Sequence, residues 1–143
     1  MQLNIQVKKD RKLSDTLNER VSRIFLELSS ESLTTEIKKK TPVDKGKLRG
    51  SWTPKLSRNQ LSVKNTRNYA VYVEKGTGMF SEQPHMITPR TANVFHAEIG
   101  GEDVFFREHK GMEGRHMAEK GTKEFKKQIP KIWRNAFLQA TRK

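Results

Sequence analysis

A long segment with helical hydrophobic spacing constrains the fold of this chain more than any other feature. Between residues 10 and 40, apolar residues recur three or four positions apart at Leu13, Leu17, Val21, Ile24 and Leu28, and continue with Leu33 and Ile37. This spacing predicts an amphipathic helix. Either Asp10 or Ser14 is suited to cap its start. Pro42 disfavours a helical conformation at Thr41, so the helix should end there.

Alternating patterns predict β-strands on both sides of this helix. Leu3, Ile5 and Val7 alternate with polar residues, which predicts a short, half-buried strand at the edge of a sheet. Further strands are predicted over residues 48–56, 61–65 and 69–74, the last of them interior, and over residues 94–99 and 103–108. The polar run at 57–60 predicts a hairpin turn, and the glycine pair Gly100 and Gly101 predicts another.

Two further segments complete the pattern. Residues 75–92 contain Gly76, Gly78, Pro84 and Pro89 without any periodicity, which predicts a long loop between strands. From about residue 115 helical spacing returns, with one apolar face made by Phe125, Ile129, Ile132, Trp133, Ala136, Phe137 and Ala140. Gly121 and Pro130 leave open whether this is one kinked helix or two shorter ones.

The order of these elements indicates an α+β fold. We expect a mainly antiparallel β-sheet packed by a long N-terminal helix and a C-terminal helix, with the long loop between strands. A length of 143 residues is typical of one domain, so residues 1–143 are interpreted as a single domain.

The charge of the chain points to a partner of opposite charge. There are 29 Lys and Arg against 16 Asp and Glu, a formal net charge of +13. Such an excess favours nucleic acid, an anionic membrane surface or an acidic protein as partner, although solubility alone is the simpler explanation. Hydrophobic residues make up only 33% of the chain, so we expect neighbouring subunits to complete part of its apolar surface. No apolar run has the length of a membrane span or the form of a signal peptide, and a soluble protein is expected.

No arrangement of residues predicts catalysis, a cofactor or a metal site. The chain has no cysteine, and none of its four histidines has the helical spacing of a zinc pair. The sequence Lys75-Gly-Thr-Gly78 lacks the spacing of a phosphate-binding loop. We interpret Trp52, on a strand face with Leu48 and Leu56, and Trp133, on the last helix, as core residues.

Three stretches, taken together, resemble a known family. They are Thr41-Pro-Val-Asp-Lys-Gly-Lys-Leu-Arg-Gly-Ser-Trp52, then Asn68-Tyr-Ala-Val-Tyr-Val-Glu-Lys-Gly-Thr77, then Ile87-Thr-Pro-Arg90 leading into the second hairpin. Their order and spacing are similar to those of the head–tail joining proteins of long-tailed bacteriophages, also called neck, tail-completion or minor tail-component proteins. The resemblance spans residues 19–125. One departure is His109-Lys-Gly111, where the family tends to have His-Pro-Gly.

The resemblance implies a structural virion protein without enzymatic activity or cofactor. Its expected role is a ring-forming subunit that links the portal-connector complex to the tail around the DNA channel. The implied partners are further copies of the chain, connector-side and tail proteins, and DNA in the channel by non-specific contact; no membrane is implied. The implied location is the neck or tail top of the virion, and the host cytoplasm during assembly. The alternative is a sequence-nonspecific nucleic-acid-binding protein, which rests on charge alone.

The motif residues are the candidates for structural or interface roles. They are Pro42, Asp44, Gly46, Leu48, Tyr69, Glu74, Gly76, Thr77 and Pro89. Gly46 and Gly76 are expected to allow tight turns, and Asp44 to bond the local backbone. Glu74 is expected to cap a turn or to pair with a Lys or Arg, either within the subunit or across a subunit boundary. The loop at 75–92 is the segment expected to become ordered on docking.

Overall fold

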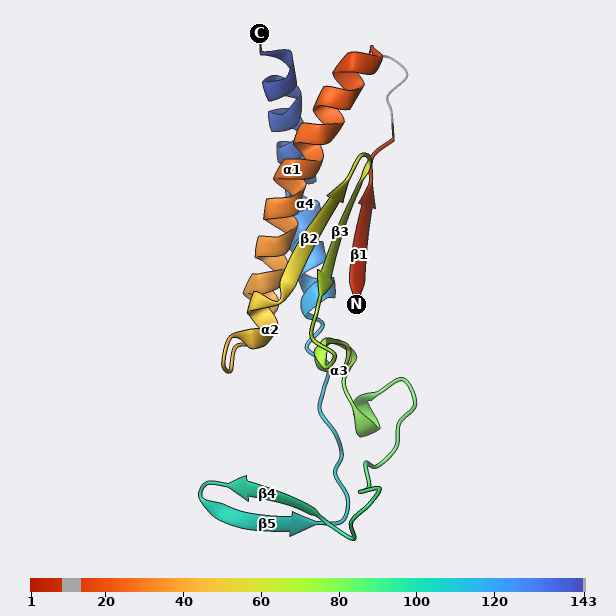
Figure 1. The fold of residues 1–143 in the computed structure, drawn as a ribbon, viewed down its shortest axis with the longest axis vertical. Coiled ribbons are helices and arrows are strands. Elements are labelled where there is room, and N and C mark those ends of the chain that lie inside the picture. Colours follow the sequence, from red (N-terminus) through yellow and green to blue (C-terminus); the bar gives the residue numbers. More distant parts are fainter. Residues whose placement is uncertain (9–13, 143) are drawn as a thin grey trace. The chain divides into compact units, whose positions relative to one another are not determined.

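The computed structural model describes residues 1–8 and 14–142. The chain forms two compact units, of which the first combines Met1–Ala70 with Met117–Lys143 and the second is Val71–His116 (Figure 1). Helices and antiparallel sheets make this an α+β fold, as predicted. The interpretation of residues 1–143 as a single domain stays a prediction. None of the helices described is long and apolar enough to cross a membrane.

The first unit contains a three-stranded antiparallel sheet. Its strands are β1 (Gln2–Gln6), β2 (Trp52–Ser57) and β3 (Gln60–Asn65), in the order β1-β3-β2. Leu3 lies opposite Val63 and Ile5 opposite Leu61, so these apolar side chains share one face of the sheet. The predicted edge position of the first strand and the hairpin turn between β2 and β3 are both confirmed.

Helix α1 (Asp15–Lys40) packs against β2, β3 and the C-terminal helix α4 (Met117–Thr141). Its start is capped by Ser14, whose hydroxyl oxygen accepts a hydrogen bond from the Leu17 N–H at 3.3 Å. It ends at Thr41, which is extended (φ −77°, ψ 126°) before Pro42, as predicted. The other candidate cap, Asp10, lies outside the described residues.

Helix α4 is one continuous helix that includes Pro130, which settles the open alternative in favour of a single helix. It runs antiparallel to α1, at its side (Figure 1). Gly121 lies at a close approach of the two helices, because a Cβ added there would be 2.6 Å from the Cα of Ile37. The glycine therefore serves helix packing and does not end the helix.

Polar side chains join α1 and α4 on one side. Ser32 donates a hydrogen bond to Gln128 at 2.7 Å, and Gln128 donates to Glu36 at 3.2 Å. Glu36 also accepts a hydrogen bond from the Lys39 ammonium at 2.7 Å, and this bond lowers the pKa of Glu36. Burial opposes that effect, while the hydrogen bond from Gln128 adds to the lowering. Glu36 is thus held in its ionised form at the helix interface.

Two of the strand predictions are wrong. The segment predicted as an interior strand at 69–74 instead forms a turn at Tyr69 and the helix α3 (Ala70–Lys75). The Gly76 N–H donates to the Tyr72 carbonyl at 2.8 Å, and Gly76 has a φ of +89°, so the glycine closes a helical turn at its C-terminal end. Residues 47–50 form a short helix, α2 (Lys47–Gly50), so that the predicted strand begins only at Trp52.

The second unit contains the predicted hairpin of strands β4 (Phe95–Ile99) and β5 (Glu102–Phe106). Gly100 and Gly101 form its turn with φ of +65° and +87°, as the glycine pair predicts. The long loop before it holds one 3-10 helix, η1 (Gly78–Phe80), and an isolated β-bridge from Ile87 to His109. The loop is therefore tied to later backbone at a few points only.

Candidate interaction surfaces

The first of the three family-like stretches, residues 41–52, is called here the first motif. Buried hydrogen bonds anchor it at the end of α1. The Thr41 hydroxyl donates to the Ile37 carbonyl at 2.8 Å and accepts from the Trp52 indole N–H at 3.0 Å. Trp52 is only 2% exposed, so this bond satisfies a donor that is cut off from water. The bond fixes the start of β2 to the end of α1 across the intervening turn.

A second buried bond holds the other half of the same turn. The Asn65 amide donates to the Leu48 carbonyl at 2.9 Å, and its side-chain oxygen accepts from the Arg67 N–H at 2.9 Å. Leu48 is buried. Gly46 has a φ of +73°, a conformation that glycine adopts without strain, and α2 begins directly after it.

Between these anchors the tip of the turn lies at the surface. Pro42 and Asp44 are exposed, and Val43 is 55% exposed, which is high for an apolar side chain. Trp52 is a core residue as predicted, but the strand face expected for it is wrong. Leu48 reaches the core from a helix, and Leu56 is 45% exposed. The motif thus presents a short exposed turn on a rigid, buried base.

The second motif is the stretch at residues 68–77. Its C-terminal part makes backbone contact with a segment of the second unit that is distant in the sequence. The Thr77 N–H donates to the Met112 carbonyl at 2.8 Å, and the Met112 N–H donates to the Thr77 hydroxyl at 3.0 Å. The Arg115 N–H donates to the Val73 carbonyl at 2.8 Å. Residues 73–79 and 110–116 therefore lie side by side along their main chains.

Glycine is required on both of these segments. A Cβ added at Gly76 would be 2.8 Å from the Met112 carbonyl oxygen, and one added at Gly111 would overlap the Thr77 carbonyl. Gly111 also has a φ of +92°. At the departure from the family pattern, the Gly111 N–H donates to His109 Nδ1 at 2.9 Å. This bond and the Ile87–His109 bridge hold the loop without the proline.

The remaining candidates fall into different surroundings. Glu74 is 7% exposed, and its carbonyl accepts from the His116 N–H at 3.2 Å. The adjacent Lys75 pairs with Glu82 at 2.6 Å. Tyr69 is 44% exposed, and Pro89 is half-buried. The proposed pairing of Glu74, within or between subunits, stays a prediction, as does the ordering of the loop on docking.

Sequence reasoning missed an exposed apolar surface on α4. Trp133, Phe137 and Leu138 are 38%, 37% and 48% exposed, so the expectation of a core position for Trp133 is only partly met. Trp133 packs edge-on against Phe25 with ring centroids 5.4 Å apart, which leaves part of its side chain exposed. Leu138 could have indicated this surface in the sequence, because it lies outside the helix face that packs on α1 and so widens the apolar side of α4.

Within the part of the chain described, metal-ligating side chains do not gather into a metal-binding group. No set of three or more His, Cys, Asp or Glu in the described residues is placed to hold a metal ion. A groove of about 430 Å³ lies between α1 and the β2–β3 turn. Its charged groups pair with one another, as in Arg58 with Glu19 at 2.9 Å and Arg23 with Glu27 at 3.0 Å.

Comparison with known proteins agrees with the two motifs. The family model described as "Bacteriophage HK97-gp10, putative tail-component" matches residues 5–76, just over half of the chain. The match runs from β1 to the glycine that ends α3 and includes both motif turns. No curated protein and no solved structure matches. The chain therefore belongs to the HK97-gp10-like family of bacteriophage tail components.

Proposed function

We propose that this protein is a ring-forming head–tail joining subunit of a long-tailed phage. In this role it links the portal-connector complex to the tail around the DNA channel, at the neck or tail top of the virion. It binds further copies of itself together with connector-side and tail proteins, and it needs no cofactor and performs no catalytic step. The observation that carries this proposal is the family match over residues 5–76.

The construction of the first motif supports a binding role. The exposed tip at Pro42, Val43 and Asp44 stands on hydrogen bonds that are buried at Thr41 and Trp52. A turn held in this way loses little conformational freedom when a partner covers it, which favours binding. The exposed Val43 gives such a partner an apolar contact at the centre of a polar turn.

The charge distribution supports a position beside DNA. The segments Met1–Ala70 and Met117–Lys143 hold 24 Lys and Arg against 9 Asp and Glu. A ring with this excess on its channel side would attract phosphate groups without reading base sequence.

Genetic removal and imaging test the proposal. A phage with a nonsense mutation in this gene should produce DNA-filled heads and separate tails in a non-permissive host. Supplying the wild-type protein should restore joined particles, and electron microscopy of virions carrying an antibody label should place the protein at the neck. Normal joined particles without the protein, or label along the whole tail tube, would contradict the proposal.

The second candidate is a sequence-nonspecific nucleic-acid-binding protein, favoured by the same excess of 24 over 9 charges. A titration with duplex DNA at several salt concentrations separates the two roles. Binding that persists at physiological salt with a steep salt dependence, in a protein that is absent from virions, would favour this candidate.

A further inference from the structure

The β4–β5 hairpin carries an apolar face that its own unit leaves partly open. Phe95 lies opposite Phe106, and Ala97 lies opposite Val104, so these four side chains share a face with Ile99. The four are only half-buried, and Ile99 is 62% exposed. A two-stranded hairpin is marginally stable in water unless another surface covers it. We therefore expect another protein surface to cover this exposed face.

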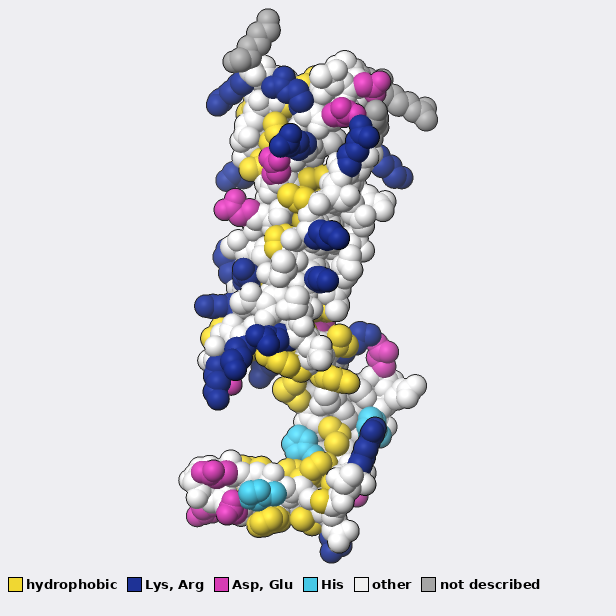
Figure 2. Space-filling model, viewed as in Figure 1, with side chains coloured by type: hydrophobic (Ala, Val, Ile, Leu, Met, Phe, Trp, Pro, Cys, Tyr) yellow, Lys and Arg dark blue, Asp and Glu magenta, His cyan; other side chains and the backbone are white. Residues whose placement is uncertain are grey.

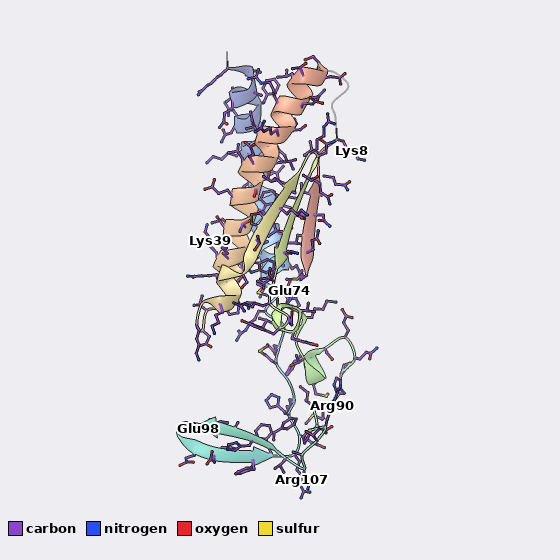
Figure 3. The ribbon with its side chains drawn as sticks, viewed as in Figure 1. Lys8, Lys39, Glu74, Arg90, Glu98 and Arg107 are labelled. Carbon is purple, nitrogen blue, oxygen red and sulfur yellow. The ribbon has the colours of Figure 1, made fainter. Side chains whose placement is uncertain are left out.

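The hairpin is acidic within a strongly basic chain. Residues 91–106 contain no Lys or Arg but hold Glu98, Glu102 and Asp103. The pairs Glu98–Asp103 and Ile99–Glu102 bring the three carboxylates to the end of the hairpin that carries the turn. Figure 2 shows acidic side chains and no basic ones at this end, and Figure 3 shows Glu98 on the hairpin and Arg107 at its opposite end. The partner surface should therefore be apolar with a basic border.

Helix α4 of the first unit has both properties. Trp133, Phe137 and Leu138 supply exposed apolar area. The helix Met117–Thr141 holds six Lys and Arg against two Glu. Lys131 and Arg134 precede Leu138 by seven and four positions, so they lie on the same side of the helix as that leucine.

We propose that the β4–β5 hairpin of one copy docks on the Trp133–Leu138 face of α4 in a second copy. The inference rests on the proposed function, since it names the contact that would join neighbours in the ring. Five-residue strands extend about 17 Å, or roughly three helical turns. That length lets the hairpin's apolar face cover Trp133 and Phe137 while Glu102, which lies opposite Ile99 on the same face, reaches Lys131 and Arg134. The two surfaces differ, so the contact is head-to-tail and closes into a ring when the rotation between neighbours allows it.

Charge reversal on the full-length protein tests the contact. The wild-type chain should self-associate in sedimentation velocity experiments. The variants Glu102→Lys and Arg134→Glu should each associate at least about tenfold more weakly, because they place like charges opposite each other. Both positions are exposed, so the fold should survive, which circular dichroism checks. Glu108→Lys, the same charge change outside both strands, is the matched control and should associate like the wild type.

Mixing the two reversed variants gives the sharper result. In the mixture each altered hairpin meets an altered helix and each unaltered hairpin meets an unaltered one, so association should recover. A wild-type chain that stays monomeric, reversed variants that associate normally, or a mixture that does not recover would each overturn the inference.

Cysteine cross-linking distinguishes a contact between copies from one within a chain. The chain has no natural cysteine. An Ile99→Cys copy mixed with a Leu138→Cys copy should form a disulfide-linked dimer. In a dilute solution of one chain that carries both substitutions, rapid formation of a disulfide within the chain would overturn the proposal. Failure of these tests while the protein is still found at the neck would reject the contact and leave the proposed function standing. If the contact is confirmed but the protein is absent from the neck, the contact stands and the proposed function is rejected.

Discussion

Replacing Gly121 with alanine tests how tightly α1 and α4 pack. An added Cβ would lie 2.6 Å from the Ile37 Cα and 2.8 Å from its backbone nitrogen. Because these are main-chain atoms, rotation of a side chain cannot relieve the overlap. One helix would have to move away from the other.

Two effects of opposite sign decide the outcome of Gly121→Ala. Alanine in a helix interior is favoured over glycine by about 1 kcal/mol. Overpacking a tight interface costs about 1–3 kcal/mol, and contact with backbone belongs at the upper end of that range. We expect a net loss of about 1–2 kcal/mol. In a chain of this length that corresponds to a fall of roughly 3–6 °C in Tm.

Thermal unfolding followed by far-ultraviolet circular dichroism measures this loss at a fixed protein concentration. Gly50→Ala is the matched control, because Gly50 ends a helix with open space around its would-be Cβ and its φ is not positive. That variant should leave Tm unchanged or raise it slightly. A Gly121→Ala protein with a Tm above the wild-type value would show that the helices do not approach as closely as described.

Three further changes probe the buried bonds and the glycine contact. Thr41→Val should lower the free energy of unfolding by about 1–3 kcal/mol, because the Trp52 N–H is left buried without an acceptor; urea unfolding followed by tryptophan fluorescence measures this. Glu36→Gln should destabilise the protein at pH 7. The difference from wild type should start to shrink as the pH falls through the ordinary glutamate pKa of 4.5 and should vanish below the lower pKa of the folded protein, because the carboxylate stabilises the fold only while ionised; urea titrations at several pH values check it. Gly111→Ala should raise hydrogen exchange in residues 73–79 and leave α1 unchanged, because its Cβ would overlap the Thr77 carbonyl; equal exchange in both proteins would refute the contact.

Elements with strong local signals could be predicted from the sequence. Helix α1 was predictable because its apolar positions repeat at helical spacing and Pro42 forbids continuation. The β4–β5 hairpin was predictable because Gly100 and Gly101 separate two strand-like runs. In both cases residues close in sequence determine the local conformation.

Features that depend on distant contacts could not be predicted. The run Ala70–Lys75 is rich in β-branched and aromatic residues, and its six residues are too few to show a helical period. Its helical form depends on the closing turn at Gly76. The pairing of residues 73–79 with 110–116 joins segments that share no sequence pattern. The exposed side of α4 was missed because a sequence shows which residues are apolar but not which of them α1 covers.

The two edges of the sheet in the first unit differ in what they can offer an incoming strand. Pro54 lies in β2, one of the two outer strands, and proline has no N–H to give to a ladder. β1, the other outer strand, contains no proline and alternates exposed with half-buried side chains along its length. Growth of this sheet by main-chain pairing is thus directed to the N-terminal strand. A strand from another protein could therefore pair with β1 and extend the sheet at that edge. The β2 edge would not accept a strand from a second copy in the same way.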